Sequence, residues 1–203
     1  MAAKEVAPRY NALPTLGEAD EGFANREPIF HTLAALLSQY NNIFGLCLVH
    51  THCKLDEGEI MLAEGNVSRP VRVADSGLYY PERWLSNGEP YEFAVRVTDA
   101  PPKPLADAFD QIVKAAGLQR VLGLYHIDGG KDTVPMIEWT EGRKNLTREL
   151  THDDRLAEPV QTAWDFGRGD PVTMACAMYC DVRMTRSGKK DVHKETRTHI
   201  DVK

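Results

Sequence analysis

The sequence predicts an α+β fold: a tandem pseudo-twofold duplication of one αββββ unit, whose mainly antiparallel sheets form a cleft or a partial barrel. Three observations support this fold class. A helix-like pattern followed by strand-like segments occurs twice along the chain, five short sequence matches recur at offsets of 77 to 81 residues, and residues 101–104 (Pro-Pro-Lys-Pro) form a stiff linker between the two stretches.

Each copy begins with an amphipathic helix. Apolar residues spaced three and four apart predict helices over residues 28–41 and 104–116, each with a proline near its first turn. The strands predicted after the helices are 43–52, 58–64, 67–73 and 91–98 in the first copy and 120–127, 134–141, 145–150 and 172–183 in the second. Two units this thin should bury their apolar faces against each other and pack as one globular body.

The five matches occur in the same order in both copies. The matched segments are 44–46 with 122–124, 60–65 with 137–142, 66–69 with 145–148, Trp84 with Trp164, and 88–90 with 169–171. Each match alone is short enough to arise by chance among common β-strand sequences. Their shared order favours tandem duplication over that coincidence.

The predicted domain organisation has four parts. Residues 1–27 are rich in Ala, Pro and Glu and are expected to form a flexible leader, followed by the first copy (28–100) and the second copy (104–183). Residues 184–203 form a basic C-terminal tail; from residue 183 to the end, seven Lys or Arg face three acidic residues. The tail has two interpretations, an arm that binds a protein partner and a solvated terminus, and the second is commoner.

Composition excludes several classes of protein. With 42% hydrophobic and 27% charged residues, the chain is neither collagen-like, coiled-coil nor wholly disordered. The net charge of −6 argues against a nucleic-acid partner. Apolar runs stay well short of the roughly 18 residues that span a bilayer, and the N-terminus carries no hydrophobic signal region. We therefore expect a cytoplasmic protein without membrane contact.

The strongest candidate site is at the end of the first strand of each copy. Period-two alternation places His50 and His52 on the face that carries the preceding leucines, and it places His126 and Asp128 together in the second copy. If the copies pack about a twofold axis through these strands, the four residues gather as a catalytic cluster, with Glu57 and Glu59 as substitute partners. The three histidines are also predicted ligands of a divalent metal. Ordinary polar strand ends are the commoner alternative.

Four further residues are predicted to bind ligand. Arg69 and Arg148 occupy matched positions and either clamp an anionic ligand or form internal salt bridges with Glu64 and Glu141, which is the favoured interpretation. Tyr80 and Trp84 belong to an aromatic segment that could line a small-molecule pocket, although core packing of Trp84 is the better expectation.

These observations predict a small-molecule-binding protein whose site lies between the two copies. A histidine–carboxylate or metal site there is compatible with catalysis, and the sequence does not decide whether turnover occurs. The G-x-S-x-G, P-loop and H-E-x-x-H signatures are absent. The alternative is a non-enzymatic protein-interaction module that uses the basic C-terminal tail.

Overall fold

A computed structural model describes residues 5–127, 136–149, 159–166 and 174–181. Within these ranges the α-helices are α1 (Val6–Asn11), α2 (Leu16–Gly22), α3 (Glu27–Ser38) and α4 (Lys103–Ala115), with one 3₁₀ turn at Val73–Asp75. The strands are β1 (Phe44–Leu48), β2 (Glu59–Glu64), β3 (Val67–Arg72), β4 (Tyr80–Trp84), β5 (Pro90–Ala94), β6 (Leu122–His126), β7 (Met136–Glu141), β8 (Lys144–Glu149), β9 (Pro159–Phe166) and β10 (Met174–Asp181).

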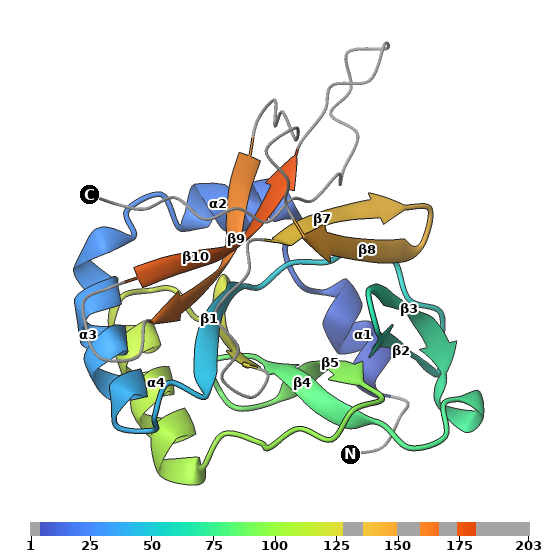
Figure 1. Cartoon of the computed structure of the whole chain (residues 1–203), viewed down its shortest axis with the longest axis horizontal. Helices are drawn as coiled ribbons and strands as arrows, with labels where there is room; N and C mark the ends of the chain where they lie inside the picture. The colour runs from blue at the N-terminus through green and yellow to red at the C-terminus, as the bar shows by residue number, and fades with distance from the viewer. Residues whose placement is uncertain (1–4, 128–135, 150–158, 167–173, 182–203) are drawn as a thin grey trace.

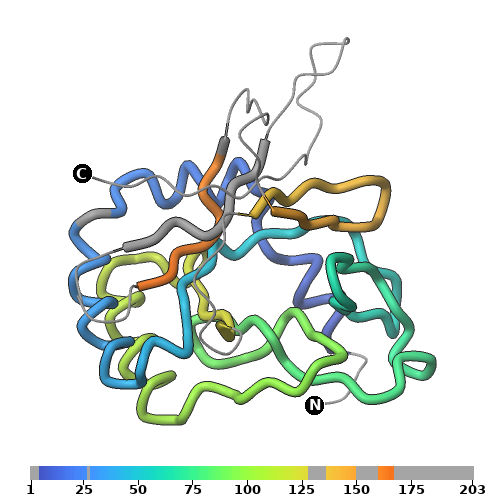
Figure 2. Tube along the Cα trace, viewed as in Figure 1, coloured from blue at the N-terminus to red at the C-terminus, as the bar shows by residue number. Residues whose placement is uncertain are grey.

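The strands form one curled sheet that closes into a barrel. Their order is β1-β6-β4-β5-β2-β3-β8-β7-β10-β9, and β9 pairs back onto β1. Neighbouring strands are antiparallel except for β2–β5 and β7–β10, which are parallel. Figure 1 shows this ring with α3 and α4 on one side, and Figure 2 traces the chain around it. The predicted α+β class with mainly antiparallel pairing is confirmed.

The two halves of the chain use corresponding pairings. Replacing β1 to β5 by β6 to β10, and the reverse, gives the same closed strand order read in the opposite direction. Leu46 and Leu124 pair with each other, and the two tryptophans complete the pattern, because Trp84 lies opposite Leu124 and Trp164 opposite Leu46. The register also skips one residue beside each tryptophan, between β4 and β5 and between β9 and β10.

Within the described ranges each half contributes five strands, whereas the sequence predicted four. The prediction missed β4 and β9. The β4 segment carries a proline and two charged side chains among its aromatics, so it lacks the apolar alternation that marks a half-buried strand. Its pairing with β5 and β6 compensates for this weak local preference.

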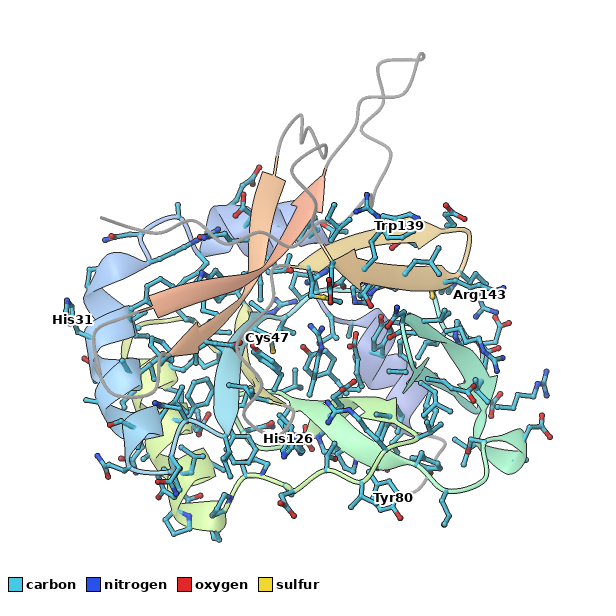
Figure 3. The ribbon with its side chains drawn as sticks, in the orientation of Figure 1. His31, Cys47, Tyr80, His126, Trp139 and Arg143 are labelled. Atoms are coloured by element: carbon cyan, nitrogen blue, oxygen red, sulfur yellow. The ribbon has the colours of Figure 1, made fainter. Side chains whose placement is uncertain are left out.

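The main hydrophobic core lies between the barrel wall and α2, α3 and α4. Leu46 and Leu48 of β1 pack there, together with Phe109 of α4 and both Trp84 and Trp164. Trp84 is therefore a core residue, as the favoured interpretation held. The opposite face of β1 carries Cys47 and Val49, which form a second cluster, and Figure 3 shows Cys47 toward the middle of the ring.

The matched glycines of β1 and β6 permit close packing on this second face. A Cβ on Gly45 would clash with the ring of Tyr125, and a Cβ on Gly123 would clash with the carbonyl oxygen of Trp84. The repeated apolar-Gly-Leu segment is thus explained by the absence of a side chain at each of these positions.

The prediction of a flexible leader is wrong for residues 5–27. Tyr10, Leu16 and Phe23 are almost fully buried, and Thr15 caps α2 through a reciprocal capping box with Glu18. The segment was misjudged because its Ala, Pro and Glu content concealed apolar residues at helical spacing.

The helices and the limits of the described residues bear on three further predictions. None of the helices in the described part of the chain is long and apolar enough to cross a membrane. The predicted basic tail, residues 184–203, lies outside the described residues, and so does Asp128.

Candidate functional site

The structure brings together only part of the predicted histidine cluster. His50 and His52 are both buried, and their ring centroids are 4.8 Å apart. His126 lies elsewhere: it pairs with Phe44, at the end of β1 that is farthest from His50, and its ring packs on the Phe44 ring. Figure 3 also shows His126 far from Trp139 of β7.

The predicted convergence of His50, His52 and His126, as metal ligands or as catalytic groups, is therefore wrong. The reason is topological. Because β1 and β6 run antiparallel through the Leu46–Leu124 pair, equivalent strand ends lie at opposite ends of the ladder. Phe44 and Leu48 alone are about 13 Å apart along an extended strand. Asp128, the predicted carboxylate partner, falls outside the described residues.

His52 instead contacts two buried carboxylates that the sequence did not nominate. Its Nε2 is 3.3 Å from Oε1 of Glu92 on β5 and 3.5 Å from Oε1 of Glu138 on β7. The side chains of Glu92 and Glu138 are 6% and 0% exposed. One imidazole nitrogen is thus shared by a carboxylate from each half of the chain.

Each carboxylate has a second partner from its own half. Arg83 of β4 places Nε 3.2 Å from Oε2 of Glu92. Asn145 of β8 donates from Nδ2 to Oε1 of Glu138 at 2.6 Å. We call these five residues, His52, Arg83, Glu92, Glu138 and Asn145, the buried charge cluster. It contains two carboxyl groups, one guanidinium group and one imidazole.

The electrostatics favour ionised groups in this cluster. Burial alone would raise the pKa of Glu92, but the nearby Arg83 and His52 lower it below its ordinary value. Burial likewise opposes the charge of Arg83, yet Glu92 and Glu138 hold the pKa of Arg83 well above its usual range. Glu92 and Arg83 are therefore a charged pair at neutral pH.

The neighbouring Cys47 and Tyr91 stay protonated. The Cys47 thiol lies 3.4 Å from the Tyr91 hydroxyl. Burial raises the pKa of Cys47 to about 11, and burial also raises the pKa of Tyr91 well above its ordinary value. Since the nucleophile is the thiolate, Cys47 is a packing residue here.

Two acceptor-bearing side chains beside Glu138 are incompletely bonded. Oδ1 of Asn145 and Oγ1 of Thr140 are buried and have no hydrogen-bond partner among the described residues. Asn145 is 3% exposed, and the two residues lie opposite each other in the β7–β8 ladder. Buried polar atoms are normally satisfied, so these two oxygens are candidate acceptors for a ligand.

The N-terminal segment holds the loop that carries His52. The Tyr10 hydroxyl accepts from the backbone N–H of His52 at 3.0 Å. Asn11 makes two bonds of 2.8 Å with the backbone of Leu55, one donated and one accepted. The backbone N–H of Thr51 donates to the carbonyl of Pro14 at 3.0 Å. His50 bonds the Leu48 carbonyl through Nδ1 at 2.7 Å.

The other predicted ligand-binding residues lie outside the buried charge cluster. Arg69 and Arg148 are exposed and lie beyond opposite ends of the short β3–β8 ladder, so they do not form a clamp. Arg69 is 3.8 Å from Glu64, as the salt-bridge interpretation expected, while Arg148 stacks over Trp139. Tyr80 pairs with Ala94 in β4–β5 and is only partly buried.

Of the two predicted substitute carboxylates, Glu57 is exposed and Glu59 is paired with another residue. Glu59 forms an ion pair with Arg143, which joins the first half of the chain to the second. That contact lowers the pKa of Glu59. Within the described ranges, no group of three or more His, Cys, Asp or Glu side chains is arranged to hold a metal ion.

Sequence reasoning missed Glu92, Glu138, Arg83 and Asn145, although one signal was present. Glu92 and Glu138 each stand between apolar or aromatic neighbours in a predicted strand. A carboxylate within such a strand is rarely buried unless it is paired. The partners Arg83 and Asn145 lie on the adjacent strands β4 and β8, whereas the shared partner His52 comes from the loop after β1, which is distant in the sequence.

Comparisons with known proteins identify no relative. No protein-family model matches the chain. Curated proteins and solved structures likewise yield no significant match. The buried charge cluster is therefore the feature from which a function can be inferred.

Proposed function

We propose that the protein binds a small molecule at the buried charge cluster, and that His52 is the acid–base group of this site. The observation that carries the proposal is the position of His52 Nε2, within 3.3 and 3.5 Å of carboxylate oxygens from two different halves of the chain. A group that can gain or lose a proton between two fixed negative charges can exchange protons with a bound molecule.

The energetics support a functional role. Burying charged groups is costly, and well-packed apolar residues of similar size are often at least as stable. Perturbed ionisable groups concentrate at functional sites for this reason. The buried charge cluster thus fits a site better than it fits a device for stability.

We infer that the two halves arose by tandem duplication, and the registers support this. The β2–β3 and β7–β8 ladders have the same register when shifted by 77 residues, since Glu59–Arg72 corresponds to Met136–Glu149. The same shift matches Glu138 with Met61.

The buried charge cluster departs from this correspondence. Glu138 replaces an apolar equivalent, and Arg83, opposite Tyr125, corresponds to Ala163, opposite Cys47. At each of these two positions a charged residue is present in one half and an apolar residue in the other. This asymmetry favours a history in which a symmetric interior became specialised for one asymmetric ligand.

The experiment is a ligand-dependent thermal-unfolding screen. The probes are methylammonium chloride, acetamide, sodium acetate and sodium methylphosphonate, each compared with sodium chloride at equal ionic strength. At ten times its Kd, a bound probe should raise the unfolding midpoint by about 3–6 °C in a chain of this size. Each variant is compared with its own midpoint without probe, so a change in basal stability does not obscure the result.

Matched variants locate the effect. Glu138→Gln and His52→Asn should reduce the shift, whereas Glu141→Gln on the same strand and His31→Asn, both at exposed positions, should retain it in full. If no probe stabilises the wild-type protein, or if all four variants respond alike, the proposed site is refuted. The alternative of an interaction module that uses residues 184–203 stays a prediction, because the tail lies outside the described residues.

A further inference from the structure

We infer that the ligand of the buried charge cluster is a small cation rich in N–H donors, of the class of protonated amines and amidines. This inference rests on the proposed function and names the chemistry of its ligand. It follows from the charges, the unsatisfied atoms and the geometry around Glu138.

The charge balance favours a cation. Glu92 is held as a carboxylate beside the Arg83 guanidinium, and Glu138 is a second carboxyl group whose ionised form would add negative charge; all three side chains are nine-tenths or more buried. A proton on His52 would offset negative charge on the carboxylates that it contacts. A bound cation would balance it equally and leave His52 neutral.

Two donors of the cluster are directed at its carboxylates. Arg83 directs Nε at Glu92, and Asn145 directs its amide N–H at Glu138. Beside Glu138, two buried atoms have no hydrogen-bond partner among the described residues: Oδ1 of Asn145, which only accepts, and Oγ1 of Thr140, which can accept or donate. A carboxylate or phosphate ligand would meet acceptors and like charge, whereas an N–H-rich cation would satisfy them.

The positions of the two carboxylate oxygens also suit a ligand that carries several hydrogen-bond donors. Oε1 of Glu92 and Oε1 of Glu138 both approach Nε2 of His52, yet a single N–H points well at only one acceptor at a time. An ammonium group carries three donors, so it can bond both carboxylates and the Asn145 oxygen together.

If the cation and the His52 proton compete, ligand binding should depend on pH. Among the described residues, the groups that face His52 include Glu92 from β5, Glu138 from β7, His50 and Cys53 from the same loop and the Tyr10 hydroxyl from α1, with Arg83 beyond Glu92. A cation competes with the His52 proton for the same carboxylates. Its apparent affinity should therefore rise as pH increases through the titration of His52.

The test uses the full chain with methylammonium as the probe. Methylammonium should stabilise the wild-type protein and Glu141→Gln, and its Kd should be at least tenfold weaker in Glu138→Gln. Asn145→Ala should weaken binding by a smaller factor, because it removes one neutral acceptor. Raising the pH from 5.5 to 7.5 should strengthen binding in the wild-type protein and leave the residual binding of His52→Asn unchanged.

Each outcome separates this inference from the proposed function. If acetate or methylphosphonate stabilises the protein through His52 and methylammonium does not, the site exists and the cation inference is overturned. If methylammonium acts equally on wild type and Glu138→Gln, its binding lies elsewhere and the inference is overturned. If none of the probes stabilises the protein, water fills the cluster and both proposals fall.

Discussion

At the scale of single residues, Glu92 shows how the protein stabilises a charge in its interior. Its carboxylate is removed from water, which by itself favours the neutral acid, but Arg83 and His52 together outweigh this cost and lower the pKa. The carboxylate thus contributes to folding through its partners. Removing one partner would leave a buried charge uncompensated, which typically costs about 3–5 kcal/mol.

The shifted pKa of Glu92 gives a pH-dependent prediction. Since the folded-state pKa is lower than the unfolded value of about 4.3, the contribution of Glu92 to stability is present above pH 4.3 and is lost as pH falls through the folded pKa. The difference in unfolding free energy between wild type and Glu92→Gln should therefore be large at pH 6–7 and shrink below about pH 4.

Urea unfolding at intervals between pH 3 and pH 7 measures this difference. Glu141→Gln is the control, because Glu141 is exposed on β7. A wild-type to Glu92→Gln difference that stays constant over the whole range would show that the Glu92 carboxylate does not depend on Arg83 and His52.

At the scale of elements, the N-terminal segment and the His52 loop form one unit. The reciprocal bonds between Asn11 and the Leu55 backbone connect α1 to the loop beyond His52, and Tyr10 contacts the loop at His52 itself. The loop has no regular structure of its own between β1 and β2, so these contacts set its path.

Asn11→Ala tests this connection. The Leu55 amide bonds the Asn11 side chain, so the substitution should cost about 1 kcal/mol and accelerate hydrogen exchange at Leu55. Asn87→Ala is the control, since Asn87 makes a similar side-chain bond to the backbone of Glu89 in a different turn. Unchanged exchange at Leu55 in Asn11→Ala would separate the N-terminal segment from the support of the loop.

Some elements were predictable from sequence because their signals are local. The helices near residues 28–41 and 104–116 follow from apolar spacing, and the observed α3 and α4 fall within a few residues of those ranges. Burial of His50 and His52 followed from alternation after β1. The partners of His52 could not be predicted, because Glu92 on β5 and Glu138 on β7 are distant from His52 in the sequence and meet it only in the folded sheet.

At the scale of the whole molecule, barrel closure joins the two halves. The contacts β1–β6, β4–β6, β3–β8 and β1–β9 all connect a strand of the first half to a strand of the second. Neither half can complete the sheet without the other, and the main core contains Trp84 from one half and Trp164 from the other. The halves should therefore unfold together.

Fluorescence of single-tryptophan proteins tests this cooperativity. One protein retains Trp84 and the other retains Trp164, with the remaining tryptophans replaced by Phe. In each protein, the fluorescence transition should coincide with the loss of far-ultraviolet circular dichroism. Two separated transitions, with Trp84 and Trp164 reporting different ones, would mean that the halves are independent domains.

The central claim is that His52 Nε2, between Glu92 and Glu138, is the position where ligand and proton compete. Imidazole ¹H–¹⁵N spectra, assigned by His52→Asn and His31→Asn and recorded during a methylammonium titration, test this claim most directly. The account predicts that the His52 Nε2 resonance moves with saturation while those of His31 and His126 stay fixed, and that Glu138→Gln removes the response. A His52 resonance that stays constant while methylammonium stabilises the protein would contradict it.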